Sequence, residues 1–264
     1  MSVVKALRNQ SSYEYDNTFN LIYKELATRM KRVPKRKQEY IAKPICDVMN
    51  KMFDNISQIS YGYFKGKLDE KYDLISSAID TLSEFEKPLM IYQIIEGVES
   101  KKIRRIADMI ENEEALLNGL LPEDKKHPYK SFLVLNWDYI NRAEFMSNMV
   151  KLNRYTHTKV MHGSNSLKYT SSAMLINLMD DALYQVVKAN RKIPETHDEY
   201  MRRRKCISTA IQKLEQANRP MLTYFNIMQY SERIMIEWSD MLTKEIKKLR
   251  ALQQSDAKRF KELK

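Results

Sequence analysis

Residues 75–90 read ISSAIDTLSEFEKPLM, and residues 207–222, which lie 132 positions later (207 − 75), read ISTAIQKLEQANRPML without a gap. Identical pairs fall in and just after these stretches: Ile75/Ile207, Ser76/Ser208, Ala78/Ala210, Ile79/Ile211, Leu82/Leu214, Pro88/Pro220 and Tyr92/Tyr224. The same offset relates a further set downstream: Asp108/Asp240, Met109/Met241, Glu113/Glu245, Leu117/Leu249 and Leu120/Leu252. A match that continues across a connecting loop indicates a tandem duplication. A repeat of roughly 130 residues is too long for a solenoid unit and has the size of a small domain.

We therefore expect two units, residues 1–124 and 125–264, joined through the polar, proline-containing segment 120–130. With five Gly and seven Pro in 264 residues, the chain has few turn signals, which favours long helices. Apolar residues recur at helical spacing in four segments of each unit. These segments cover residues 12–33, 40–62, 68–95, 100 to about 120, 135–161, 170–191, a seventh that opens at Thr196, and 231 to near the C-terminus. The predicted fold class is all-α, with two tandem four-helix up-down bundles.

Local signals predict several helix ends and one kink. Capping boxes are a Ser or Thr followed three residues later by Glu, and prolines inside a helix remove a backbone donor. Glycine commonly ends a helix, and serine commonly begins one. The residues concerned are Ser11 with Glu14, Thr196 with Glu199, Ser100 as a cap, Gly163 as a stop, Pro88 as a kink or split, and Pro220 at the equivalent place in the second unit.

The net charge of +11 is unevenly distributed along the chain. Residues 1–127 carry 21 Lys and Arg against 20 Asp and Glu, whereas residues 128–264 carry 24 against 14. The second unit therefore holds nearly all of the excess. An excess of this size suits a polyanionic partner such as nucleic acid, although a solvated basic face without a specific partner is a common alternative.

The two cysteines, Cys46 and Cys206, both fall within apolar helical patterns. They are expected to be small buried hydrophobes of a reducing compartment, a disulfide or metal site being much the weaker interpretation. The N-terminus has no apolar stretch of signal-peptide length, and no apolar run approaches the ~18 residues that a membrane span needs. A cytoplasmic protein without membrane association is expected.

Catalytic and cofactor motifs are not recognisable. The histidines His127, His157, His162 and His197 are isolated, without the His-x-x-x-His or Glu-x-x-His spacing of a metal-binding helix, and are expected to be satisfied surface residues. With so few glycines there is no phosphate-binding loop or dinucleotide fingerprint. Glu113 and Glu245 recur between the units and are candidates for a buried inter-helix contact. We expect no enzyme, no cofactor and no metal.

Two clusters of cations are the candidate nucleic-acid-binding residues. The first, which we call the connector cluster, comprises Lys31, Arg32, Lys35, Arg36 and Lys37 around Pro34. The second, the α-helical cluster, comprises Arg202, Arg203, Arg204 and Lys205. Cations that stabilise a helix C-terminus are an alternative for Lys31 and Arg32, but the second cluster lies near a helix N-terminus, where the dipole disfavours positive charge. Four consecutive residues sweep about 300° around a helix, so at least one points toward the bundle or a neighbouring subunit and the rest can reach phosphates.

Several stretches resemble one family. The opening MSVVKALRNQSS, the segment RVPKRKQEY, the segment EYMRRRKCISTAIQKLEQ and the tail IEWSDMLTKEIKKLRALQQSDAKRF are similar to the accessory variability determinant proteins of diversity-generating retroelements, found in gut bacteria and their phages. The resemblance implies a four-helix unit without catalytic activity that forms a basic pentamer and binds a reverse transcriptase and RNA. The resemblance maps the basic Pro-Lys-Arg segment of the family to Pro34, Lys35 and Arg36. It maps the family's Arg-Arg segment, which follows a polar loop, to Arg202, Arg203 and Arg204.

The two units differ where these basic elements lie. The first has DEKYDL at residues 69–74 where the second has MRRRKC at 201–206, and the second has MHGSN where the first has VPKRK. Each unit thus contains only one of the two basic segments. Because the chain is duplicated, the sequence does not determine the stoichiometry of a homo-oligomer. The sequence predicts a non-catalytic, basic accessory protein that binds RNA, with DNA as a second candidate, and assists a reverse transcriptase in mutagenic retrohoming. The alternative is a helical scaffold or adaptor that binds an acidic protein.

Overall fold

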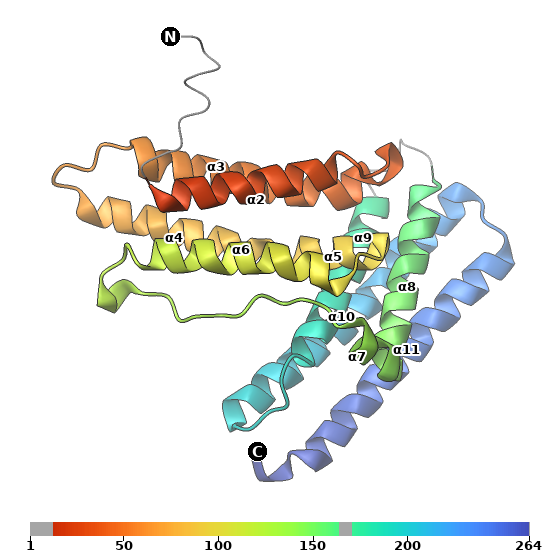
Figure 1. The fold of residues 1–264 in the computed structure, drawn as a ribbon. Coiled ribbons are helices and arrows are strands. Elements are labelled where there is room, and N and C mark those ends of the chain that lie inside the picture. The colour runs from red at the N-terminus through yellow and green to blue at the C-terminus, as the bar shows by residue number, and fades with distance from the viewer. Residues whose placement is uncertain (1–12, 164–170, 264) are drawn as a thin grey trace. The chain divides into compact units, whose positions relative to one another are not determined.

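The computed structural model describes residues 13–163 and 171–263. Helices and connecting turns make up these residues, and no strand occurs among them (Figure 1). The predicted all-α class is confirmed. The chain divides into two compact units, which we call unit 1 (residues 1–92 and 98–134) and unit 2 (residues 93–97 and 135–264). The predicted joint at residues 120–130 lies in unit 1, and the chain passes to unit 2 a few residues further on.

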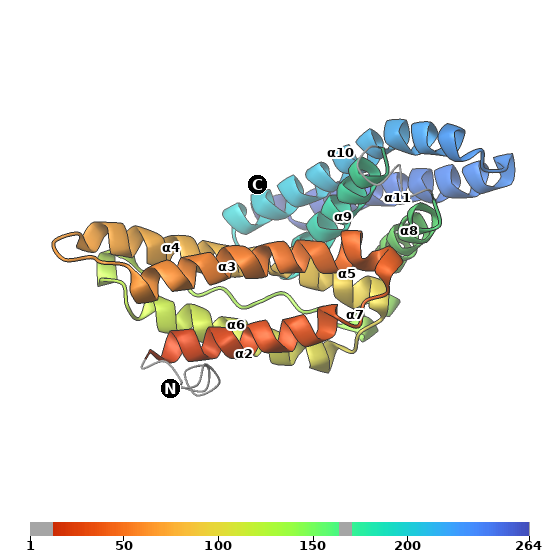
Figure 2. The ribbon, with the colours of Figure 1, turned by 90° about the horizontal axis from the view of Figure 1, so that it is seen from above.

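Unit 1 is built on four helical stretches. Its α-helices are α2 (Glu14–Met30), α3 (Lys43–Tyr61), α4 (Leu68–Glu84), α5 (Glu86–Glu96, whose last turn belongs to unit 2) and α6 (Ser100–Asn118). Short turns occupy Lys35–Lys37, Gln38–Ala42 and Glu123–Lys125. Contacts join α2 to α3, α3 to α4, α4 to α6 and α6 back to α2, which closes a ring of four helices (Figure 1 and Figure 2). Apolar residues at three- and four-residue spacing, such as Phe19, Ile22 and Leu26 of α2, fill its core.

Unit 2 has the same order of neighbours. Its α-helices are α7 (Trp137–Arg142), α8 (Glu144–Met161), α9 (Ser171–Ala189), α10 (His197–Met228) and α11 (Glu232–Arg259), with a final turn at Lys261–Leu263. Contacts join α8 to α9, α9 to α10, α10 to α11 and α11 to α8. The element boundaries repeat at the sequence offset as well. The end of α5 at residue 96 and the start of α6 at residue 100 become 228 and 232 when 132 is added, and these are the end of α10 and the start of α11.

The two equivalent prolines have different effects. Near Pro88 the helix is split, since α4 ends at Glu84 and α5 begins at Glu86, with Phe85 between them, as the missing backbone donor predicts. Pro220 lies inside α10, which continues through it without interruption. The proline is buried there among the core residues of the helix.

Some predicted helix ends need correction. Residues 135–161 do not form one helix, because Ala143 is extended (φ −91°, ψ 103°) and separates α7 from α8. The cap of α6 is Glu99 rather than Ser100. Thr196 does cap α10, and its side chain accepts from the backbone N–H of Glu199. Ser11 lies outside the described residues.

Gly163 also has a different role from the predicted one. Its backbone is not in the left-handed region that a glycine stop uses, since Gly66 and Gly97 are the glycines with positive φ among the described residues. A Cβ at position 163 would instead lie 1.8 Å from the Tyr224 hydroxyl. Glycine is needed because the Tyr224 side chain packs directly against the backbone at the end of α8.

Candidate nucleic-acid interface

The connector cluster lies on a folded turn between α2 and α3. Val33 is buried and its N–H donates to the Met30 carbonyl, so the chain turns back at the end of α2. The Lys37 N–H donates to the Pro34 carbonyl at 2.8 Å, and the Gln38 side chain donates to the Val33 carbonyl at 3.3 Å. These bonds fix the backbone that carries the cations.

The cations on this turn point into solvent. Lys31, Arg32, Lys35 and Arg36 are exposed, and none of the four makes an ion pair with a residue in the described ranges 13–163 and 171–263. Lys37 is half-buried. A cation is stabilising at a helix C-terminus, which accounts for Lys31 and Arg32 without a ligand. The same argument does not apply to Lys35 and Arg36, because they follow Pro34 and lie beyond the end of α2.

The α-helical cluster occupies the second turn of α10. Arg202, Arg204 and Lys205 are exposed and make no ion pair within the part of the chain that the structure describes. Arg203, between them, has only 12% of its side chain exposed. The cluster therefore divides into cations that can reach a ligand and one that belongs to the protein interior.

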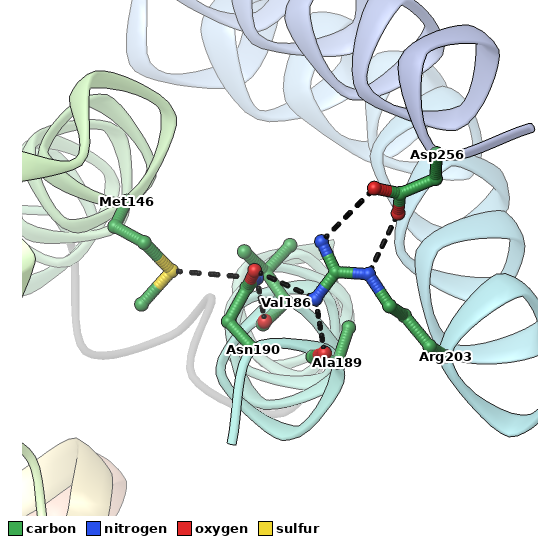
Figure 3. Close-up of polar contacts among 6 residues, drawn as sticks. All are labelled: Met146, Val186, Ala189, Asn190, Arg203 and Asp256. Atoms are coloured by element: carbon green, nitrogen blue, oxygen red, sulfur yellow. Dashed lines mark hydrogen bonds and ion pairs between the residues drawn. The ribbon is translucent and has the colours of Figure 1, made fainter. Parts of the chain in front are cut away.

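Arg203 of α10 is held by residues of α11 and of the end of α9 (Figure 3). Its Nε donates to Asp256 of α11 at 2.6 Å, and Asp256 has 7% of its side chain exposed. Its Nη1 donates to the Ala189 carbonyl at 2.6 Å and to the Asn190 side chain at 3.0 Å, at the end of α9. A guanidinium held in this way ties α9, α10 and α11 together. We therefore remove Arg203 from the candidate phosphate contacts.

The inward position of Arg203 on α10 could be predicted from the sequence. It lies three residues after Tyr200 and four before Ile207, both of which are buried, so it falls on the inward stripe of α10. Asp256 lies seven residues after the buried Leu249 on the inward stripe of α11. A charged residue at an inward position of one helix indicates that an opposite charge must face it, because an unpaired buried charge is very costly. The sweep of four cations around the helix predicted that at least one points toward the bundle or a neighbouring subunit, and the helical spacing identifies Arg203 as the residue that points toward the bundle.

The two clusters lie at opposite ends of the repeat. The connector cluster joins the first and second helices of its bundle, and the α-helical cluster begins the third. In an up-down bundle these two connections are at opposite ends, as the α2–α3 and α3–α4 connections of unit 1 are in Figure 1. Each cluster is therefore a separate candidate site within its own unit.

Four other cations, on α6 and α11, form ion pairs. Arg104 pairs with Asp108 at 2.9 Å and also with Glu111, and Lys102 pairs with Glu99. On α11, Lys248 pairs with Glu144 and Arg250 pairs with Glu215. These four residues therefore differ from the exposed cations of the two clusters, for which no ion pair occurs among the described residues.

His157 is not the surface histidine that the sequence suggested. It is 1% exposed on α8, and its Nε2 lies 2.8 Å from Asp180 Oδ1 on α9. The amide of Asn153 donates to the same carboxylate oxygen at 2.8 Å. This contact links two helices of unit 2. No group of three His, Cys, Asp or Glu side chains suited to a metal ion occurs within residues 13–163 and 171–263.

Glu113 and Glu245 are buried at equivalent positions of the two units. They are 0% and 1% exposed, and neither carboxyl has a hydrogen-bond partner among the residues that the structure describes. Burial raises the pKa of Glu113 to about 9, with a further contribution from Asp16, and burial raises the pKa of Glu245 to about 8. Both carboxyls are therefore protonated and uncharged at neutral pH.

The cysteines are free and half-buried, which corrects the expectation that they would be buried hydrophobes. Burial raises the pKa of both thiols, and for Cys206 the nearby Lys188 and Lys205 act in the opposite direction. A raised pKa keeps a thiol protonated, so neither is an activated nucleophile. Among the helices that the structure describes, none is long and apolar enough to cross a membrane.

No family model, curated protein or solved structure matches this chain.

Proposed function

We propose that this protein is a non-catalytic, basic accessory protein that binds nucleic acid and assists a reverse transcriptase, as the resemblance to proteins of diversity-generating retroelements implies. The proposal is supported by exposed cations that form no ion pair with any described residue. They are Lys31, Arg32, Lys35 and Arg36 on unit 1 and Arg202, Arg204 and Lys205 on unit 2. Cations of this kind bind phosphates without reading bases and release counterions when they do so.

The absence of ion pairs matters because carboxylates are available elsewhere on both units. Arg104 on α6 and Lys248 and Arg250 on α11 are paired, whereas Lys31, Arg32, Lys35, Arg36, Arg202, Arg204 and Lys205 form no ion pair with any residue that the structure describes. Like charges held close together repel, and an anionic ligand would relieve that repulsion. RNA is the proposed ligand, with DNA as a second candidate, and the protein is proposed to act in the cytoplasm as a homo-oligomer with the polymerase.

The proposal is tested by the affinity of the full chain for a short labelled RNA, measured by fluorescence anisotropy. Replacing Lys35 and Arg36 with Ala, or Arg202 and Arg204 with Ala, is expected to weaken binding across RNA sequences. Lys102→Ala is the matched control, because its charge is already paired with Glu99 at 3.0 Å. Unchanged affinity in both cluster variants, with folding intact, would refute the role of these cations.

The accessory role needs a second measurement. The purified chain is expected to show no polymerase or nuclease activity, and to increase the yield or mutation frequency of cDNA made by a reverse transcriptase encoded beside it. Polymerase or nuclease activity that a point substitution in this chain abolishes would overturn the non-catalytic assignment. Binding of an acidic protein that RNA cannot displace would favour the scaffold alternative.

A further inference from the structure

Unit 1 has a groove between α2 and the first half of α3. Its volume is about 540 Å³, within the ~300–1,000 Å³ of small-molecule sites. Met30 and Met49 contribute buried apolar surface, and Tyr23 and Cys46 line it from the two helices. Exposed amide groups come from Gln38 and Asn50.

The groove is continuous with the connector cluster. Lys31 lines the groove and is also the first cation of that cluster. Gln38, another lining residue, follows the turn that carries Lys35 and Arg36 and is bonded back to the Val33 carbonyl at 3.3 Å. Apolar and aromatic surface, amide groups and unpaired positive charge thus adjoin within one unit.

This combination fits unpaired bases better than a double helix. In single strands the bases can turn outward and stack on an aromatic ring, and their edges can bond with amides, while lysines and arginines hold the phosphates. The bases of a duplex are stacked on one another and cannot enter a groove of this kind. A neutral apolar ligand would use the groove but not the adjacent cations.

Two groove-lining positions of α3 correspond to buried positions in unit 2. The apolar residues Val48, Met49 and Ile56 of α3 align with Leu178, Met179 and Val186 of α9 at an offset of 130. At this offset, Cys46 and Asn50 correspond to Ile176 and Asp180 (46 + 130 and 50 + 130), and both of these are buried. Asp180 bonds there with Asn153 and His157 of α8. The second unit also lacks the VPKRK segment. The open groove and the basic connector therefore occur together in unit 1.

We infer that the α2–α3 groove binds unpaired bases of a single-stranded nucleic acid whose phosphates lie against Lys31, Lys35 and Arg36. This inference rests on the proposed function and adds the class of nucleic acid and the place where its bases lie. Tyr23 supplies the stacking surface. Its ring is also supported by Phe53, with centroids 6.2 Å apart.

The test compares three probes on the full chain: a single-stranded oligonucleotide as RNA and as DNA, an abasic strand of the same length and charge, and a duplex. Tyr23→Ala is expected to weaken single-strand binding about tenfold, in line with the loss of one base–ring stack, and to leave the abasic strand and duplex unaffected. Tyr23→Phe keeps the ring and is expected to bind as the wild type does. Tyr139→Ala is the matched control, because Tyr139 is a similarly exposed tyrosine on unit 2.

A second variant makes the test independent of Tyr23. Ala27→Trp would fill the groove from α2 and is expected to reproduce the selective loss, with helical content and melting temperature measured for each variant. An equal loss of affinity for the abasic strand, or no loss of affinity for the base-containing strand, would overturn the inference but not the proposed function. Unchanged single-strand binding with a shift to a smaller oligomer would show that a second copy occupies the groove, which also overturns it. Failure of the wild type to bind any probe would instead refute the proposed function.

Discussion

One turn of α10 carries cations with two different roles. Arg202, Arg204 and Lys205 are exposed and have no ion pair with the described residues, and Arg203 is bonded to Asp256, Ala189 and Asn190. The difference follows from the 100° between successive helical residues, which turns one residue of the four inward. Substitutions in this turn should therefore separate folding from binding.

Arg203→Ala is expected to lower the free energy of unfolding by about 3–5 kcal/mol, because it leaves the Asp256 carboxylate buried without its partner. Arg204→Ala, the matched control, should change stability by about 0.5 kcal/mol or less. Chemical denaturation of both variants measures the difference. A stability loss no larger for Arg203→Ala than for Arg204→Ala would contradict the assigned role of Arg203.

The buried carboxyls of Glu113 and Glu245 predict a pH-dependent stability. Their pKa values in the folded chain are about 9 and about 8, against an ordinary value of 4.5. The folded state therefore holds protons that the unfolded chain has released, and the free energy of unfolding should fall as pH rises from about 4.5 toward 9. Glu113→Gln should reduce this fall by up to about 1.4 kcal/mol per pH unit near neutrality, and Glu245→Gln should do the same.

Denaturation across this pH range, with the exposed Asp54→Asn as the control, measures the effect. At pH 8 the Gln variants are expected to be more stable than the wild type, because an amide needs no proton to remain uncharged. A pH dependence that neither substitution alters would mean that the carboxyls are solvated or paired in solution.

Helix ends differ in how they are capped. Thr196 accepts a hydrogen bond from the Glu199 N–H, and Glu199 accepts one from the Glu195 N–H at 2.9 Å. Ser231, at the equivalent position of α11, makes no capping bond through its side chain. Thr196→Ala should therefore cost about 1 kcal/mol of stability, and Ser231→Ala clearly less. Equal losses in thermal or chemical denaturation would show that the cap of α10 is not formed in solution.

The helices themselves were predictable because their apolar residues recur at helical spacing. Ile45, Met49, Met52 and Ile56, for example, form one stripe of α3 and are all buried. The break at Ala143 was not predictable, because alanine is a good helix former and only the packing around α7 and α8 opposes its propensity. The role of Gly163 depends on Tyr224, which is distant in sequence, so no local signal could reveal it.

The candidate site was predictable only in part. Runs of cations such as Lys35–Lys37 and Arg202–Lys205 are visible in the sequence, but whether each cation is paired depends on neighbouring helices. Arg203 shows this dependence, since its partner Asp256 is 53 residues away. The α2–α3 groove was not predicted, because an opening between two helices depends on side chains from both and on the turn that joins them.

At the scale of the whole molecule, the duplication makes a direct prediction. An experimentally determined structure should show residues 68–121 superposing on residues 200–253, because the identities and the junction between α5 and α6 follow one offset. The largest difference is expected at the split between α4 and α5, where α10 is continuous. Two segments that do not superpose would end the argument for a shared origin.

The central claim is that the open cations of the two clusters bind nucleic-acid phosphates, and its most direct test is the salt dependence of RNA binding. Affinity is measured over a range of salt concentrations for the wild type and for the Arg202→Ala, Arg204→Ala, Lys205→Ala triple variant. If each cation contacts one phosphate of a single strand, the slope of log affinity against log salt should fall by about 2 in the triple variant. Arg203 is left intact so that folding is preserved. An unchanged slope and affinity in the folded variant would contradict the claim and leave these residues as a solvated helix face.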